Sequence, residues 1–179
     1  MDKLKKLFLA FRNSKKYDNI IQLGYNCEGA YRFYRNYRFV DSSLFGWSFI
    51  TFEQLKNALL NLQEVGSEDF AYNPKNYMLA CTKTGIYFHG RTPLSSFTDD
   101  EEKNNLLLEE DKKELHSRIN YLIEKFKKTA KDGKKNLYIK KISKKEAEQE
   151  NFRDDILWLH NYLKDFCKKV FKLLLITEE

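Results

Sequence analysis

The sequence has no long hydrophobic run, few cysteines, and little proline or glycine. No window of about 18 uncharged apolar residues occurs, which excludes a membrane-spanning helix. Two prolines and seven glycines among 179 residues leave little room for a flexible linker. The three cysteines are widely spaced and form no CxxC pair, which argues against a disulfide framework or a zinc site. Together with the missing export signal, this predicts a reducing, cytoplasmic environment.

The composition is that of a folded domain. Hydrophobic residues make up 42% of the chain and charged residues 32%, so the chain is neither disordered nor membrane-embedded. We expect residues 17–179 to form a single α/β domain, because this length is typical of one. The sequence stops at Glu179, directly after an apolar strand, where a domain often continues.

Residues 1–16 are basic and amphipathic. Their apolar side chains recur at i, i+3, i+4 and i+7, one face of a helix: Leu4, Leu7, Phe8 and Phe11. Two interpretations remain open for this predicted helix. It packs on the domain, or it makes a peripheral contact with an anionic membrane.

A formal net charge of +6 raises the question of nucleic-acid binding. Most lysines, however, alternate with acidic residues, as in the stretch 111–128, which is typical of a solvated helix face. Aromatic and basic residues also mix between Tyr31 and Arg38, but these aromatics have the spacing of a buried helix face. We therefore expect no nucleic-acid partner.

The first half of the chain predicts a strand, a tight turn and a helix, followed by a helix and a hairpin. The apolar run 19–23 is of strand type, Gly24 breaks it, and Asn26 can cap a helix over 27–37. Residues 38–43 read as extended. Thr51 and Gln54 form a capping box for a helix to about residue 62. Residues 77–81 and 86–89 read as two strands of a hairpin joined by 82–85.

The second half predicts a long helix and a strand–helix–strand unit. Thr98 and Glu101 form a second capping box, and the helix that follows has an apolar stripe and stops at Asp132–Gly133. The stripe comprises Leu108, Leu115, Ile119, Leu122 and Phe126. Residues 137–142, 152–166 and 170–176 read as strand, helix and strand, a crossover that favours parallel pairing. The expected fold is α/β, with one mixed, mainly parallel sheet flanked by helices.

Cys27 has the position of a nucleophile. It falls in the first turn of the predicted helix, directly after the strand and the Gly24 turn. A helix amino terminus favours the thiolate, and its amides can hold an oxyanion. The alternative is an ordinary buried cysteine. Cys81 and Cys167 fall on apolar positions and read as core.

Three segments together resemble a bacterial family described as papain-like cysteine peptidases. They are Ile21-x-Leu23–Gly24–Tyr25–Asn26–Cys27, Ser42–Ser43–Leu44–Phe45–Gly46–Trp47 and Ile86–Tyr87–Phe88–His89. The family pattern is an LGxNC turn, an S-x-PFDW segment and a strand ending in His-Asp, and the resemblance covers roughly residues 19–176. Leu44 and Gly46 replace the proline and aspartate of the second motif, and Gly90 replaces the acid after the histidine.

The resemblance implies that Cys27 is the nucleophile and His89 the general base, as a Cys–His pair requires. It also implies an unknown acyl or glycan-linked substrate, since some members lie among genes for surface-polysaccharide assembly. A substrate would then contact the neighbouring residues Tyr25, Asn26, Phe45 and Trp47. No phosphate loop, Rossmann glycine pattern or metal-ligand spacing is present, so no cofactor and no metal are expected.

Other polar residues give weaker signals. His116 and His160 lie inside helices and read as packing or surface residues. Gln22 can donate to an oxyanion only if the alternation of its strand points the side chain toward Cys27. The third residue that would orient His89 is left open among Asp41, Asp99 and Asp100.

Three functions thus remain open, the third being a membrane-surface accessory protein that works through the basic helix of residues 1–16. The first is a thiol-dependent hydrolase or acyl-transferase that acts on an amide, ester or thioester. The second is a non-catalytic glycan- or protein-binding accessory domain that uses the aromatic residues around Trp47.

Overall fold

The computed structural model describes residues 17–24, 43–67, 70–73, 78–92, 94–98 and 100–177. It is a mixed α/β structure with two sheets. Its strands are β1 (Asn19–Gln22), β2 (Ser48–Phe49), β3 (Phe70–Asn73), β4 (Met78–Cys81), β5 (Tyr87–His89), β6 (Asn136–Ile142) and β7 (Phe171–Thr177). Its helices are α3 (Phe52–Leu60), α4 (Glu101–Lys131), α5 (Lys144–Ala147) and α6 (Phe152–Phe166), with a 3-10 turn at Leu94–Ser96.

The first sheet is parallel and has the order β1-β6-β7. β6 pairs with β7 over its whole length, and α6 connects the two strands, which confirms the predicted crossover. β1 pairs with β6 from Asn19↔Asn136 to Gln22↔Ile139. All three strands therefore run in one direction, and the sheet has one amino edge and one carboxyl edge.

The second sheet is antiparallel and has the order β2-β5-β4-β3. The predicted hairpin is confirmed as β4 and β5, in which the Gly85 amide donates to the Cys81 carbonyl at 2.7 Å. Gly85 has a φ of 68°, a conformation that glycine adopts without strain. β2 is a short edge strand that pairs with β5 through Ser48↔Phe88 and Phe49↔Tyr87.

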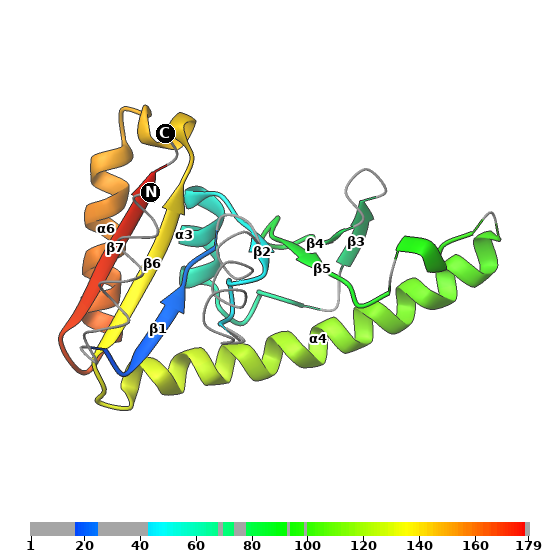
Figure 1. Cartoon of the computed structure of the whole chain (residues 1–179), viewed down its shortest axis with the longest axis horizontal. Coiled ribbons are helices and arrows are strands. Elements are labelled where there is room, and N and C mark those ends of the chain that lie inside the picture. The colour runs from blue at the N-terminus through cyan, green and yellow to red at the C-terminus, as the bar shows by residue number, and fades with distance from the viewer. Residues whose placement is uncertain are drawn as a thin grey trace, which may run out of the picture.

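The prediction of one mixed, mainly parallel sheet is therefore wrong for the described residues. Parallel and antiparallel strands are kept in separate sheets, which lie next to each other along α4 (Figure 1). The two sheets share packing contacts but no ladder, because the chain turns at Gly24 instead of extending β1 alongside β2. The mixed α/β class itself is confirmed.

α3 begins where its sequence predicts. Thr51 and Gln54 form the reciprocal capping box, with the Gln54 amide donating to Thr51 Oγ1 at 3.2 Å. The Gln54 side chain also donates to the Gly85 carbonyl at 2.6 Å, so the cap ties α3 to the hairpin turn. A second buried contact fixes the same helix end, because the Phe52 amide donates to Glu146 Oε1 at 2.6 Å.

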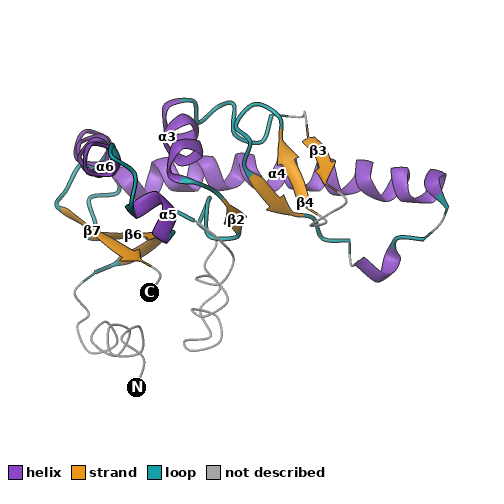
Figure 2. Cartoon of the chain, turned by 90° about the horizontal axis from the view of Figure 1, so that it is seen from above, coloured by secondary structure: helices purple, strands orange, loops and turns teal. Residues whose placement is uncertain are grey.

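α4 is a 31-residue helix that lies along both sheets (Figures 1 and 2). Its amino-terminal cap is Asp100, which accepts from the Lys103 amide at 3.1 Å, so the predicted capping box of Thr98 and Glu101 is wrong by two residues. Thr98 instead accepts from the Asp100 amide. The helix ends at Lys131 with Asp132 as its cap, as predicted. Ile123, rather than the predicted Leu122, is fully buried in its apolar stripe.

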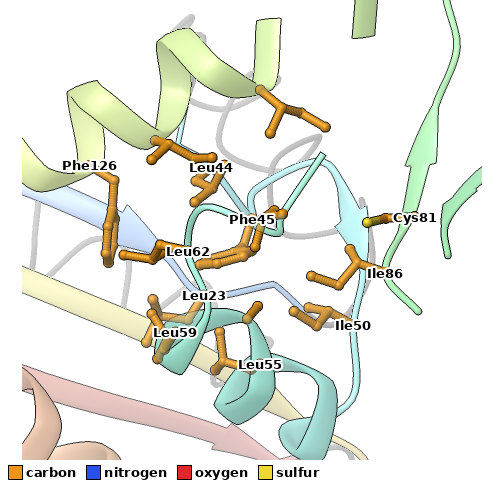
Figure 3. Close-up of a cluster of buried hydrophobic side chains, with 14 of the residues drawn as sticks. Leu23, Leu44, Phe45, Ile50, Leu55, Leu59, Leu62, Cys81, Ile86 and Phe126 are labelled. Atoms are coloured by element: carbon orange, nitrogen blue, oxygen red, sulfur yellow. The ribbon is translucent and has the colours of Figure 1, made fainter. Parts of the chain in front are cut away.

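One hydrophobic core connects the two sheets through α3 and α4. Figure 3 shows Leu23 from the parallel sheet side by side with Phe45, Ile50 and Leu59, while Cys81 and Ile86 enter from the hairpin. The Phe126 ring of α4 packs edge-on against Phe45, with 6.1 Å between ring centroids. A smaller cluster on the other face of the parallel sheet contains Leu137 and Ile139.

Two predicted helices lie outside the described residues, namely 1–16 and 27–37, as does most of the extended segment 38–43. None of the helices in the described ranges combines the length and hydrophobicity needed to cross a bilayer.

Candidate functional site

The carboxyl end of β1 turns sharply against the antiparallel sheet. Leu23 is fully buried, and its amide donates to the Ile139 carbonyl at 2.8 Å, which extends the parallel pairing by one residue. Gly24 follows with a φ of 75°. A Cβ at this position would lie 2.9 Å from the Phe45 carbonyl oxygen and would overlap the Ile50 side chain. The turn thus requires glycine both for its dihedral angle and for its close packing.

This turn brings together three segments that lie far apart in the sequence. A Cβ on Gly24 would be 3.3 Å from Ser48 Oγ, and Ser48 pairs with Phe88 across the β2–β5 ladder. His89 follows Phe88 as the last residue of β5. The residues that flank this end of the ladder are Trp47 before β2 and His89 on β5. The end of β1, the 45–48 turn and the end of β5 therefore meet at one junction.

His89 is exposed and its backbone is held by α4. Arg118 Nη2 donates to the His89 carbonyl at 2.8 Å. Partial burial of the ring and, secondly, the positive charge of Arg118 lower the pKa of His89. The lowered pKa favours the neutral ring, which is the form that can accept a proton.

A buried carboxylate holds the loop after His89. Asp111 of α4 accepts hydrogen bonds from the amides of Arg91 and Thr92, both at 3.1 Å to Oδ1. Gly90 packs directly on this carboxylate, so that a Cβ there would overlap Asp111 Oδ2. Gly90 thus lets the loop close over the Asp111 side chain.

Lys140 is fully buried beneath the junction. It lies near the carboxyl end of β6, and its Nζ donates to the Ile50 carbonyl at 3.2 Å, next to the Gly24 turn. No other hydrogen bond joins this ammonium group to a residue in the described ranges. Burial lowers the pKa of Lys140 to about 8, and the negative charge of Glu146 partly opposes this shift. A buried charge with so little compensation is costly.

Only some of the predicted site residues lie within the part of the chain that the structure describes. Cys27, Tyr25 and Asn26 lie outside the described residues. Phe45 is fully buried in the core and packs on Phe126, so it is placed where a ligand cannot touch it. Trp47 is 37% exposed beside the end of the β2–β5 ladder.

The other histidines have packing roles, as predicted. His116 Nδ1 lies 2.6 Å from the Gly66 carbonyl, and its Nε2 lies 3.0 Å from Asn120 Nδ2. His160 packs against the Phe171 ring, with 5.3 Å between centroids. Of the three acids considered as partners of His89, Asp100 caps α4, whereas Asp41 and Asp99 lie outside the described residues.

The remaining cysteines are also described. Cys81 is fully buried, as predicted, and Cys167 is half-buried with its Sγ 3.2 Å from the Tyr138 hydroxyl. Burial raises the pKa of Cys81, but the nearby Thr84 hydroxyl and the backbone amides of Gly66, Thr84 and Lys83 outweigh it, so that the pKa is lowered overall. Burial raises the pKa of Cys167.

The sequence interpretation did not single out Lys140, Arg118 or Asp111. For Lys140 the signal was present, because the alternation of β6 places it on the same face as Tyr138 and Ile142, which are fully buried. The contacts of Arg118 and Asp111 connect α4 to a loop about 20 to 30 residues away along the chain, and local sequence patterns do not report such contacts.

Among the residues that the structure describes, no group of three histidine, cysteine or acidic side chains could hold a metal ion. Comparisons with family models, with curated proteins and with solved structures find no match to this chain.

Proposed function

We propose that this protein is a thiol-dependent hydrolase or acyl-transferase in which Cys27 is the nucleophile and His89 the general base. The observation that carries the proposal is the junction at Gly24. It joins the strand that leads to Cys27 with the strand that ends at His89, although His89 lies 62 positions after Cys27 in the sequence. Cys27 follows Gly24 by three residues, which is at most about 11 Å of chain. Chain length thus tethers Cys27 to the junction at which β5 ends.

The proposed reaction has two balanced halves. The Cys27 sulfur attacks the carbonyl carbon of an amide, ester or thioester, and His89 takes the thiol proton and delivers it to the leaving amine, alcohol or thiol. The acyl group is then held as a thioester on Cys27. Water or another acceptor attacks this thioester, His89 takes the acceptor's proton, and the acyl product departs as the thiol is restored. The lowered pKa of His89 supports its role as proton acceptor.

Thiol reactivity tests the proposal directly. We expect iodoacetamide at pH 6 to label Cys27 before Cys81 and Cys167, as followed by peptide mass mapping. Cys81 is the sharper internal control, because hydrogen bonds lower the pKa of its thiol while complete burial denies access to the reagent. His89→Gln should slow labelling of Cys27 at least about tenfold at this pH, since the proton acceptor is lost.

Two further variants complete the test. Cys27→Ser should abolish turnover of an activated ester or thioester while the melting temperature is retained. His160→Gln is the matched control, because His160 packs on Phe171 away from the junction. Equal labelling of Cys27 in the wild type and in His89→Gln, at the rate of a free thiol, would contradict the mechanism.

A second candidate function is a glycan- or protein-binding accessory domain. Exposed aromatic side chains near the junction favour it, since Phe49 is 43% exposed and Trp47 is 37% exposed. Trp47→Ala would then abolish ligand binding, whereas Cys27→Ser would leave it unchanged. Loss of turnover in Cys27→Ser separates this function from the first.

A further inference from the structure

The amino edge of the parallel sheet carries a concentrated positive charge. Three segments meet there, 17–19 before and within β1, 127–136 between α4 and β6, and 164–172 between α6 and β7. The Lys168 amide donates to the Ala130 carbonyl at 3.3 Å, and the Asp18 amide donates to the Lys135 carbonyl at 2.9 Å. These hydrogen bonds fix the three segments against one another. We call this surface the lysine edge.

The lysine edge accounts for the net charge of the whole chain. It contains three acidic residues and nine lysines, so its formal charge is +6, the same as that of all 179 residues. The lysines are Lys127, Lys128, Lys131, Lys134, Lys135, Lys164, Lys168, Lys169 and Lys172. The formal charges of the remaining residues sum to zero.

Most of these lysines have no acidic partner. Lys127 pairs with Glu124 at 2.9 Å and Lys134 with Asp132 at 3.8 Å. The other seven are exposed and form no ion pair within the described part of the chain. Two of the three acids of the edge also accept hydrogen bonds from the backbone, Asp18 from the Lys135 amide and Asp132 from the Lys134 amide, both at 2.9 Å.

An apolar side chain projects from the middle of this charge. Val170 is 84% exposed, the largest exposed fraction among the large hydrophobic side chains of the described residues. Lys168 and Lys169 precede it and Lys172 follows it. An apolar tip surrounded by ammonium groups matches the interface of an anionic bilayer, where charged headgroups lie just outside the hydrocarbon.

We propose that the lysine edge binds the surface of a membrane that contains anionic phospholipid. The lysines attract the headgroups, and Val170 enters the interfacial region. Two observations favour a bilayer over a nucleic acid. All nine cations of the edge are lysines rather than arginines, which nucleic-acid sites use for bidentate contacts. The three aromatic rings of this edge are half-buried: Phe166 stacks on Phe126, Phe171 packs edge-on against Tyr138, and Tyr17 packs on the cluster of Leu137 and Ile139. They therefore offer no open platform for bases.

Binding at this edge would orient the protein. The Gly24 junction lies beyond the carboxyl end of β1, and the seven residues of β6 span about 20 Å between the two edges of the sheet. The candidate site would then face away from the bilayer. The proposal does not depend on the chemistry proposed for Cys27, because none of its residues belongs to that site.

Vesicle cosedimentation of the full chain tests the proposal. Vesicles of phosphatidylcholine with about 30% phosphatidylserine should bind the protein, and pure phosphatidylcholine should not. Replacing Lys168, Lys169 and Lys172 by glutamine should weaken binding about 100-fold, since each lysine near an anionic surface contributes about fivefold. Val170→Ser should weaken it about tenfold. Raising the salt concentration from about 0.1 to 0.5 M should release the protein.

A matched variant controls for net charge. Lys83, Lys103 and Lys113 are exposed and lie far from the lysine edge, and their replacement by glutamine removes the same charge. Binding should then change by about twofold or less. Melting temperatures establish that both triple variants are folded. If the edge variant does not fold, Val170→Ser and the salt titration test the proposal in its place.

Three outcomes would overturn the proposal. The first is equal wild-type binding to both kinds of vesicle. The second is equal loss in the edge variant and in the control variant. The third is binding of a DNA duplex that depends on the edge lysines while vesicles are not bound. Glutamine at Lys3, Lys5 and Lys6 tests the separate prediction for residues 1–16. If that variant alone loses binding, the lysine edge is not the membrane surface.

Discussion

The two sheets differ in how far apart their strands lie along the chain. In the antiparallel sheet all four strands come from residues 48–89, and β3, β4 and β5 are joined by short connections. In the parallel sheet, β1 pairs with a strand that begins 117 residues later. The β3–β4–β5 pairings are thus local along the chain, whereas the pairing of β1 with β6 depends on long-range packing. The candidate site lies where the two meet, at Gly24.

The largest expected effect on stability comes from a substitution at Gly24, where the two sheets meet. Gly24→Ala should destabilise the protein by about 4 kcal/mol, because a Cβ combines an unfavourable φ with overlap against Ile50 and close approach to the Phe45 carbonyl. Gly133→Ala is the matched control. It has the same φ of 75° but no atom within 4 Å of the added Cβ, so it should cost only about 1 kcal/mol.

Urea denaturation of both variants measures the difference, which reports the packing between the sheets alone. Equal destabilisation of Gly24→Ala and Gly133→Ala would show that the junction tolerates a methyl group. The two sheets would then be less tightly joined than their contacts indicate.

A second, smaller effect should have the opposite sign. Lys140→Met should stabilise the protein by about 2 kcal/mol at pH 7, because it removes a buried charge at the loss of one hydrogen bond to Ile50. The folded pKa of about 8 lies below the ordinary value of 10.5. The unfolded chain therefore holds the proton more tightly, and wild-type stability should rise as the pH increases from 8 to 10.5.

The advantage of Lys140→Met should accordingly be greatest below pH 8 and should shrink toward pH 10.5. Urea denaturation at pH 7 and pH 10 measures this dependence. Lys172→Met, on the exposed face of the neighbouring strand β7, should change stability by about 0.5 kcal/mol or less at both pH values. A destabilised Lys140→Met protein at pH 7 would mean that the ammonium group stabilises the junction.

The smallest of the three effects concerns the antiparallel side. Asp111→Ala should destabilise the protein by about 1.5 kcal/mol, because the amides of Arg91 and Thr92 lose their acceptor. Glu110→Ala, one residue earlier and exposed, should change stability by about 0.5 kcal/mol or less. Thermal denaturation compares the two variants. Indistinguishable melting temperatures would show that water satisfies both amides.

The sequence predicts those parts of the fold whose cause is local. The capping box of Thr51 and Gln54, the end of α4 at Asp132 and the hairpin around Gly85 all depend on residues within a few positions of one another. The parallel β6–α6–β7 unit follows from its order along the chain.

What the sequence did not predict depends on distant contacts. The separation into two sheets follows from the packing of Gly24 on Phe45 and Ile50, which no local pattern contains. Phe45 looked like part of a pocket because its neighbours are aromatic, yet it is buried against Phe126 of α4. The cap of α4 moved from Thr98 to Asp100 because both residue types cap well and the sequence alone does not rank them.

Because Asn19 pairs with Asn136, β1 is synthesised well before the strand with which it pairs. A ribosome adds about 5–20 residues per second, so roughly ten seconds pass between the synthesis of β1 and that of β6. The antiparallel sheet and α3 have been synthesised well before then. Nascent chains should therefore complete the Gly24 turn only after β6 has been synthesised.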